Sequence, residues 1–481
     1  MKTKCRICNS LALLLLCCYA VWACLCGGER LCAKAGSASE SSQDDAVQIV
    51  LDILRSGDQE MQAVAIAMAK EMSGTEVTKA LAEELPNLSS TGQVQLLSAL
   101  GDRGDAAALP AVLTATKAAD TSVRTAALRA LGQLGGASSV GLLAQAAATT
   151  TGEEQKAARD SLYRLRGPQV DQAILAAIPK AEAGTKVELI SSVGQRSIYA
   201  GVSTLLKTAE DSDRKVRAES FKVLKVISGP PHLPALVELL VNVQSSSDRN
   251  EAQKTVAAVA HKIQDKDRQA EAVLAVLGSV KELQSRCSLL SVLGKIGDNS
   301  ALPALTAALK EKNVEVQTAA VRALAEWPTP GPLADLLKVA QSSDNKVHRI
   351  LALRGFIRLL GLESERAVEE TVEMYKKAMS LAPDAVEKRR ALSGLANTRS
   401  LGALQMAVDY LDDATLSREA EYAAVKIAAG IYADFPQQAG DVLRKILQTS
   451  KNDSVRQQAQ EIVNEIEQSD DAGSQLTEKE N

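Results

Sequence analysis

The chain has 481 residues and a formal net charge of -4, and its composition is unusual for that length. Aromatic residues make up 2% of the chain although hydrophobic residues make up 46%, so Ala, Leu and Val must supply most of the core. A core of small aliphatic side chains favours closely packed helices over a β-sandwich or barrel. Charged residues are 24% of the chain and show no basic excess. This composition excludes disorder throughout and argues against nucleic-acid binding.

The first 35 residues have the three parts of a secretory signal peptide. Basic residues stand at positions 2, 4 and 6, an unbroken apolar run covers 11–26, and Ala33-Lys34-Ala35 matches a cleavage pattern of small residues. The sequence therefore predicts export to the periplasm or the extracellular space, with no membrane insertion after cleavage.

Two alternatives for this N-terminus stay open. The apolar run could remain as an uncleaved membrane anchor, although it is shorter than the roughly 20 residues of a spanning helix. Cys24 could carry a lipid anchor, although Trp22 stands where a small residue is usual. Seven of the eight cysteines lie within these 35 residues, so Cys287 alone remains after cleavage. The mature monomer is then free of disulfides, and Cys287 is predicted to be a small core residue.

The rest of the chain repeats a helical pattern. An Asp or Asn that can cap a helix is followed two or three residues later by Val, and then by apolar residues at helical spacing. The five valines are Val123, Val216, Val316, Val347 and Val455. Their separations correspond to a period of about 33 residues, which is typical of a solenoid.

A second helix precedes each capped helix in the pattern. Pro110, Pro234, Pro303 and Pro332 stand near its first turn, where a missing N–H costs little. Gly101, Gly132, Gly229, Gly297 and Gly361 are expected at helix ends, where a left-handed conformation favours glycine. Less regular units fill the gaps, so the sequence predicts roughly thirteen helical pairs stacked into one continuous core.

Segments 120–146 and 290–327 carry a resemblance to a known repeat family. The aromatic positions of tetratricopeptide repeats and the T-P-L-H turn of ankyrin repeats are missing. The two segments resemble short HEAT repeats of the kind found in bilin-lyase subunits, and residues 348–428 resemble HEAT arrays of exported bacterial proteins. The resemblance implies an all-α, armadillo/HEAT-type α-solenoid with a right-handed superhelix. It covers residues 46–466, with a flexible linker at 36–45 and a disordered acidic tail at 467–481.

The sequence offers no recognisable catalytic site. Its three histidines lie far apart in the chain, and the zincin, nucleophile-elbow and phosphate-loop motifs are missing. We therefore expect no enzyme activity, no cofactor and no metal.

One cationic cluster is the candidate binding site. It consists of His348, Arg349, Arg354, Arg358, Lys388, Arg389 and Arg390, on the capped helices of two successive units. Arg354 and Arg358 are four residues apart and share a helix face, where a guanidinium could hold a carboxylate or phosphate. The alternative is an internal ladder, in which each Arg pairs with an acidic residue of a neighbouring unit. Arg124, Arg217 and Arg456 recur at one repeat position and favour such a ladder.

These features predict a noncatalytic scaffold or adaptor that docks another exported protein on its concave face. Trp327 is either a contact residue or a plug where a loop departs. An accessory subunit that holds a ligand or substrate for a bilin-lyase-like, sugar-processing or redox enzyme is the first alternative. A glycan binder is the second, and the scarcity of aromatic platforms argues against it.

Overall fold

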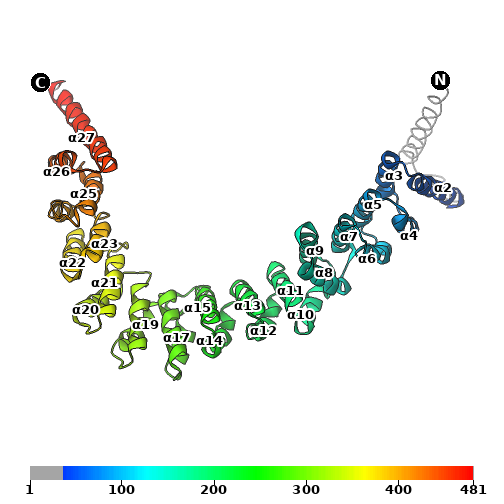
Figure 1. Cartoon of the computed structure of the whole chain (residues 1–481), viewed down its shortest axis with the longest axis horizontal. Coiled ribbons are helices and arrows are strands. Elements are labelled where there is room, and N and C mark those ends of the chain that lie inside the picture. Colours follow the sequence, from blue (N-terminus) through cyan, green and yellow to red (C-terminus); the bar gives the residue numbers. More distant parts are fainter. Residues whose placement is uncertain (1–35, 480–481) are drawn as a thin grey trace. The chain divides into compact units, whose positions relative to one another are not determined.

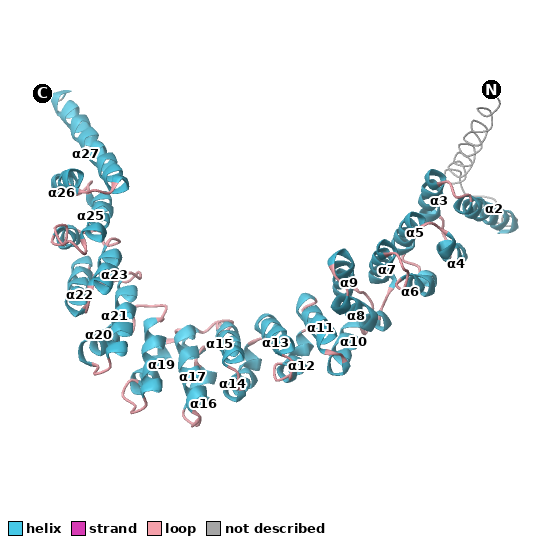
Figure 2. Cartoon of the chain, in the orientation of Figure 1, coloured by secondary structure: helices cyan, strands magenta, loops and turns pink. Residues whose placement is uncertain are grey.

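A computed structural model describes the backbone of residues 36–479 and the side chains of residues 45–468. The described residues form helices and loops, without a strand among them (Figure 2). The even-numbered helices are α2 Gly36–Arg55, α4 Thr75–Glu84, α6 Leu109–Ala115, α8 Val140–Thr149, α10 Val170–Ala177, α12 Val202–Thr208, α14 Leu233–Asn242, α16 Glu271–Leu277, α18 Leu302–Ala308, α20 Leu333–Ser342, α22 Val368–Leu381, α24 Leu401–Val408 and α26 Pro436–Thr449. The odd-numbered helices are α3 Gln59–Glu71, α5 Ser90–Arg103, α7 Thr121–Leu134, α9 Gly152–Arg164, α11 Ala183–Gln195, α13 Arg214–Ile227, α15 Ser246–Ala260, α17 Leu283–Ile296, α19 Val314–Ala325, α21 Lys346–Leu360, α23 Ala385–Leu395, α25 Ser417–Ile431 and α27 Asp453–Lys479.

The helices from α2 to α27 form thirteen successive pairs, as the repeat spacing predicted. The chain divides into two compact units, unit 1 up to Ile174 and unit 2 from Leu175 onward, with the boundary within α10. Within each unit the helices alternate between two layers (Figure 1). Most odd helices pack on the even helix of their own pair and on the neighbouring odd helices of the same unit, as α7 packs on α9 and α17 packs on α19. We call the two layers the odd layer and the even layer.

The capped starts of the odd helices follow from the predicted Asp and Asn residues. The Asp120, Asp213 and Asn313 side chains each accept hydrogen bonds from backbone N–H groups of the first turn. Two predicted caps are shifted by one position. Asn345 rather than Asp344 caps α21, and Asn452 rather than Asp453 accepts the first N–H bonds of α27. Both shifts occur where two residues that can cap a helix stand side by side.

Prolines open the even helices at the predicted places. Pro110, Pro234 and Pro303 occupy the first turns of α6, α14 and α18, where the missing N–H has no partner in the helix. A single 3₁₀ turn leads into several of these helices, as Asn299–Ala301 does before α18. The prolines therefore fix where each even helix begins.

The glycines serve two different purposes. Gly297 ends α17 with a φ of 71°, as predicted for a glycine at a helix end. Gly132 instead lies inside α7, where a Cβ would come within 2.6 Å of the Ser161 Cβ of α9. Gly294 of α17 has the same role, because its Cβ would lie 2.6 Å from the Ala323 Cα of α19. Interior glycines thus bring neighbouring odd helices into close contact.

The core is mostly Ala, Leu and Val, as the composition indicated. Trp327, Phe221, Phe356 and Tyr375 are the largest fully buried side chains of the described chain. The burial of Trp327 shows that it plugs the end of α19 and is not a surface contact residue. Cys287 on α17 is only partly buried, and its burial raises the pKa of its thiol.

Two predicted terminal segments differ in secondary structure from the expectation. Helix α2 begins at Gly36, and α27 continues to Lys479, so the linker at 36–45 and most of the tail at 467–481 are helical. Neither segment contains a proline, and each continues an amphipathic helix without a break. The predicted signal peptide and Cys24 lie outside the described residues. Among the helices of residues 36–479, none combines the length and apolarity needed to cross a bilayer.

Candidate functional site: a cationic groove on α19, α21 and α23

The structure divides the seven residues of the predicted cationic cluster between different surroundings. His348 is a buried residue of α21, and its Nε2 lies 2.7 Å from Thr318 Oγ1 of α19. Arg349 Nη1 donates to the Ser343 carbonyl at 3.2 Å, and Arg389 Nε donates to the Ala385 carbonyl of its own helix. These three side chains are therefore engaged in local structure.

His348 gives the fold a predictable response to acid. Burial lowers its pKa from the ordinary value of 6.5. The unfolded chain therefore takes up this proton at a higher pH than the folded chain, and the free energy of unfolding should fall as pH drops below about 6.5. We expect His348→Gln, whose amide can still bond to Thr318, to weaken this dependence in thermal unfolding followed at a series of pH values. An unchanged slope in the variant would show that other groups control it.

Lys388 lies on the side of α23 that faces the loop before α25. The pKa of Asp413 in that loop is lowered, mainly by hydrogen bonds from Thr415 and to a smaller extent by the charge of Lys388. Lys388 is thus close enough to Asp413 to act on its charge, and it is not among the residues that line the groove described below.

Arg354 and Arg390 converge on one buried carboxylate. Arg354 Nε and Nη2 donate to Glu387 Oε1 at 2.9 and 2.5 Å, and Arg390 Nε lies 3.4 Å from Oε2. Glu387 is 2% exposed and occupies the first turn of α23, one repeat beyond Arg354. This pairing is of the internal-ladder type. It uses Nε and Nη2 of Arg354, so fewer of its N–H donors remain for an external anion.

Arg358 holds the end of the preceding odd helix. Its Nε donates to the Ala325 carbonyl at 2.8 Å and its Nη2 to the Trp327 carbonyl. Lys262 does the same for α13, with bonds to the carbonyls of Val226 and Ser228 at 2.8 and 2.7 Å. Side chains of one repeat thus satisfy carbonyls that the end of a helix leaves without partners.

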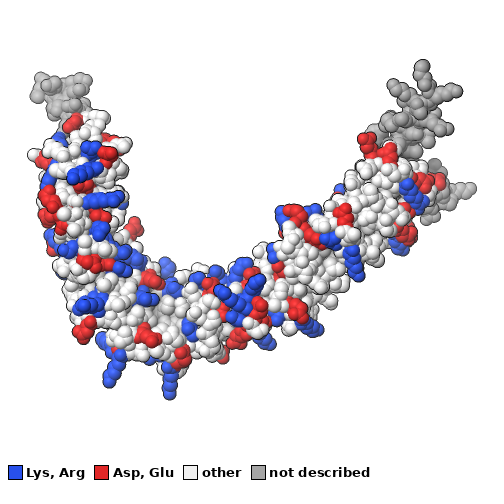
Figure 3. All heavy atoms as spheres, viewed as in Figure 1, with Lys and Arg blue, Asp and Glu red and all other residues white. Residues whose placement is uncertain are grey.

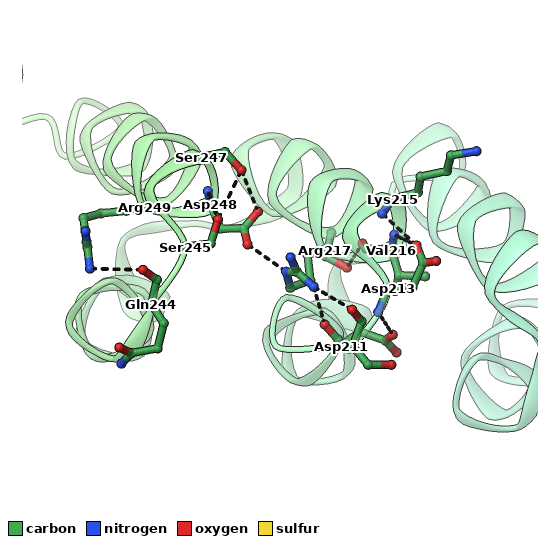
Figure 4. A network of polar contacts seen from close by, with 12 residues as sticks. Asp211, Asp213, Lys215, Val216, Arg217, Gln244, Ser245, Ser247, Asp248 and Arg249 are labelled. Carbon is green, nitrogen blue, oxygen red and sulfur yellow. Dashed lines mark hydrogen bonds and ion pairs between the residues drawn. The ribbon is translucent and has the colours of Figure 1, made fainter.

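The predicted ladder is present near the start of the odd helices, at the fourth residue after the cap. Arg124 Nε and Arg217 Nε each lie 2.7 Å from an acidic residue in the first turn of the next odd helix, Glu154 and Asp248. Arg217 Nη1 also donates to the carbonyls of Asp211 and Ser212, both at 2.9 Å (Figure 4). The third predicted member, Arg456, instead contacts Asp453 of its own helix.

A groove of about 480 Å³ lies along α19, α21 and α23 and includes Arg354, Arg358 and Arg390. Sequence reasoning missed several of its polar lining residues, among them Arg322 of α19, Glu326 just after α19 and Tyr375 of α22. Arg322 could have been found, because it stands nine residues after the cap Asn313 just as Arg354 stands nine after Asn345. Tyr375 carried no such repeat signal. The structure therefore brings three of the predicted residues together and adds Arg322, Tyr375 and the carboxylate of Glu326, whose charge acts on Arg358.

A family model for HEAT repeats matches residues 78–162 and 270–356. These two segments are HEAT repeats. Solved structures of Kap121p share the HEAT/armadillo-type architecture. The complex with Nup53p has a TM-score of 0.53 at 10% identity, over 90% of this chain and 55% of that chain. The complex with Ste12p has a TM-score of 0.52 at 11% identity, over 89% and 55%.

The HEAT-repeat chain thus spans about half the length of the Kap121p chain. A third structure, the karyopherin Kap121p bound to the extreme C-terminus of the protein phosphatase Cdc14p, matches with a TM-score of 0.52 at 11% identity. At this identity the likeness is one of fold. No curated protein matches the sequence. The described chain is a HEAT-type α-solenoid, as the repeat pattern predicted.

Proposed function

We propose that the HEAT-repeat chain is a noncatalytic scaffold of the cell envelope or secreted space, and that it docks a partner protein on its odd layer. The observation that carries the proposal is the groove on α19, α21 and α23, which opens on that layer. Arginine is a residue on which binding energy often concentrates at protein interfaces. Two solved structures of similar fold are complexes of Kap121p with Nup53p and with Ste12p, which supports a protein as the partner class.

An affinity capture that compares the two layers tests the docking face. The purified chain is immobilised, exposed to an envelope extract of its own source, and the retained proteins are identified by mass spectrometry. Arg322→Ala with Lys346→Ala removes two cations from the odd layer, and Lys376→Ala with Lys377→Ala removes two from the even layer. We expect a partner that the first variant loses and the second keeps. Equal retention by both variants would contradict docking on the odd layer.

Export is the second part of this proposal. It rests on the basic residues, apolar run and Ala33-Lys34-Ala35 pattern of the first 35 residues, and on the confinement of seven cysteines to them. We expect the chain purified from its own host to begin at Gly36. Its intact mass and its N-terminal sequence measure this start. An N-terminus at a lipid-modified Cys24 would show the lipid anchor instead, and an intact N-terminus would show that the segment is not removed.

A further inference from the structure

The lysines and arginines of unit 2 are concentrated on its odd helices. Helices α11 to α25 of the odd layer carry twenty lysines and arginines against eight aspartates and glutamates, a net charge of +12, whereas the last odd helix, α27, has an acidic sequence. The even helices α12 to α26 carry six against seven, a net charge of -1. The whole chain has a net charge of -4, so the positive charge belongs to one layer rather than to the chain. Figure 3 shows blue side chains gathered over α13 and over α21 and α23, with red ones between them.

Some of the guanidinium N–H donors in the groove have no hydrogen-bond partner among the described residues. Arg354 and Arg390 are occupied by Glu387, and Arg358 uses Nε and Nη2 on backbone carbonyls. Arg322 has no hydrogen-bond or ion-pair partner among the described residues, and Nη1 of Arg358 has none there either. Arg322 and Arg358 therefore face the groove with donors that the described chain does not satisfy.

Tyr375 adds a buried donor to the same groove. Its side chain is 0% exposed, and its hydroxyl has no partner among the described residues. The hydroxyl lies next to Gly394, where a Cβ would come within 2.9 Å of it, and a Cβ on Gly361 would lie 3.9 Å away. Burial raises the pKa of Tyr375 to about 12, so the hydroxyl keeps its proton at neutral pH and can donate. A buried hydroxyl without an acceptor costs about 1–3 kcal/mol, which a ligand oxygen would recover.

We propose that the odd layer of unit 2 binds an acidic segment of the partner, and that the groove anchors one of its carboxylates between Arg322, Arg358 and the Tyr375 hydroxyl. This inference rests on the docking function proposed above and names the chemistry of the partner. Guanidinium groups bind carboxylates through paired hydrogen bonds, and a phenol hydroxyl can supply a further donor.

An acidic protein fits this face better than a nucleic acid. The odd helices interleave acidic residues such as Glu219, Glu251 and Glu315 with the cations. Double-stranded DNA carries one negative charge per about 1.7 Å of its axis, and such a continuous run would meet these carboxylates. A peptide can place neutral residues opposite them.

Isothermal titration calorimetry on the full chain tests the proposal with three probes. They are a twelve-residue peptide of alternating Glu and Ser, the same peptide with Gln for Glu, and a single-stranded oligonucleotide of equal charge. We expect the Glu peptide to bind, its affinity to fall as salt rises, and the Gln peptide to bind at least tenfold more weakly. Equal binding of the two peptides, or tighter binding of the oligonucleotide, would overturn the proposal.

Tyr375→Phe is the sharpest variant, because it removes only a hydroxyl that the described chain leaves without a partner. We expect the Glu peptide to bind it about fivefold more weakly while its thermal stability stays unchanged or rises. Arg322→Ala should weaken the peptide about tenfold, and the even-layer variant Lys376→Ala with Lys377→Ala should not. If Tyr375→Phe and Arg322→Ala both bind the peptide like wild type, the groove is not the anchor.

The two proposals fail in different ways. A captured partner that depends on the odd layer, together with no Glu-peptide binding, would leave the docking function standing and reject the acidic partner. A capture in which no retained protein depends on the odd layer would reject the docking function itself, whatever the peptide does.

Discussion

Replacing Arg217 with alanine should lower the free energy of unfolding by about 3 kcal/mol, which is the cost expected when one partner of a buried ion pair is removed. Arg217 is mostly buried, and Asp248, its partner 2.7 Å away, is buried almost completely. The substitution leaves that carboxylate without its charge partner and removes two bonds to the carbonyls of Asp211 and Ser212. Denaturant unfolding followed by circular dichroism measures the loss.

Two controls separate this effect from a general sensitivity of α13. Arg217→Met combined with Asp248→Leu replaces the pair by apolar side chains and should recover at least half of the loss. Lys222→Ala removes an exposed cation that pairs with Glu219 on the same helix, and should cost less than about 0.5 kcal/mol. A loss below about 1 kcal/mol for Arg217→Ala would mean that the ladder pairs behave as surface pairs.

Gly294→Ala should destabilise the chain by about 2 kcal/mol, the cost of overpacking a close contact. In an open helix the same change would stabilise by up to about 1 kcal/mol, because alanine favours the helix more than glycine. The added methyl group of Gly294→Ala would lie 2.6 Å from the Ala323 Cα, so α17 and α19 would have to move apart. The shift of the unfolding midpoint in denaturant shows whether Gly294→Ala is less or more stable than wild type.

Gly141→Ala is the matched control for this sign. Gly141 lies near the start of α8, and a Cβ built on it has no neighbour within 4 Å. We expect this variant to be about as stable as wild type or more stable, by up to about 0.5 kcal/mol. Destabilisation of similar size in both variants would show that close packing is not the reason.

The fold could be predicted from the sequence because its signals are local and recur. Each repeat carries its own helix cap and its own apolar stripe, and many carry a proline. A wrong prediction for one repeat therefore does not affect the prediction for the next. The shifted cap at Asn345 shows the limit of this reasoning, since Asp344 and Asn345 can both accept the same N–H bonds. The roles of the interior glycines were misjudged, because their neighbours lie on the next odd helix about 30 residues away.

The candidate site could be predicted only in part. The shared face of Arg354 and Arg358 follows from helix geometry and was correct. The pairing of Arg354 with Glu387 depends on how two repeats stack, which the sequence left open between a ladder and a groove. The hydroxyl of Tyr375 comes from the even helix α22 and is placed by packing alone.

The burial of Trp327 has an optical consequence. The chain has two tryptophans, and the other, Trp22, lies within the segment that we expect to be removed. Excitation of tryptophan would then report on one indole, enclosed in the core at the end of α19, whose own backbone carbonyl accepts a hydrogen bond from Arg358. Its emission should be blue-shifted in the folded chain and should shift to the red when this repeat opens. Tryptophan emission can therefore follow local opening next to the groove without an added label, and separately from the unfolding of distant repeats.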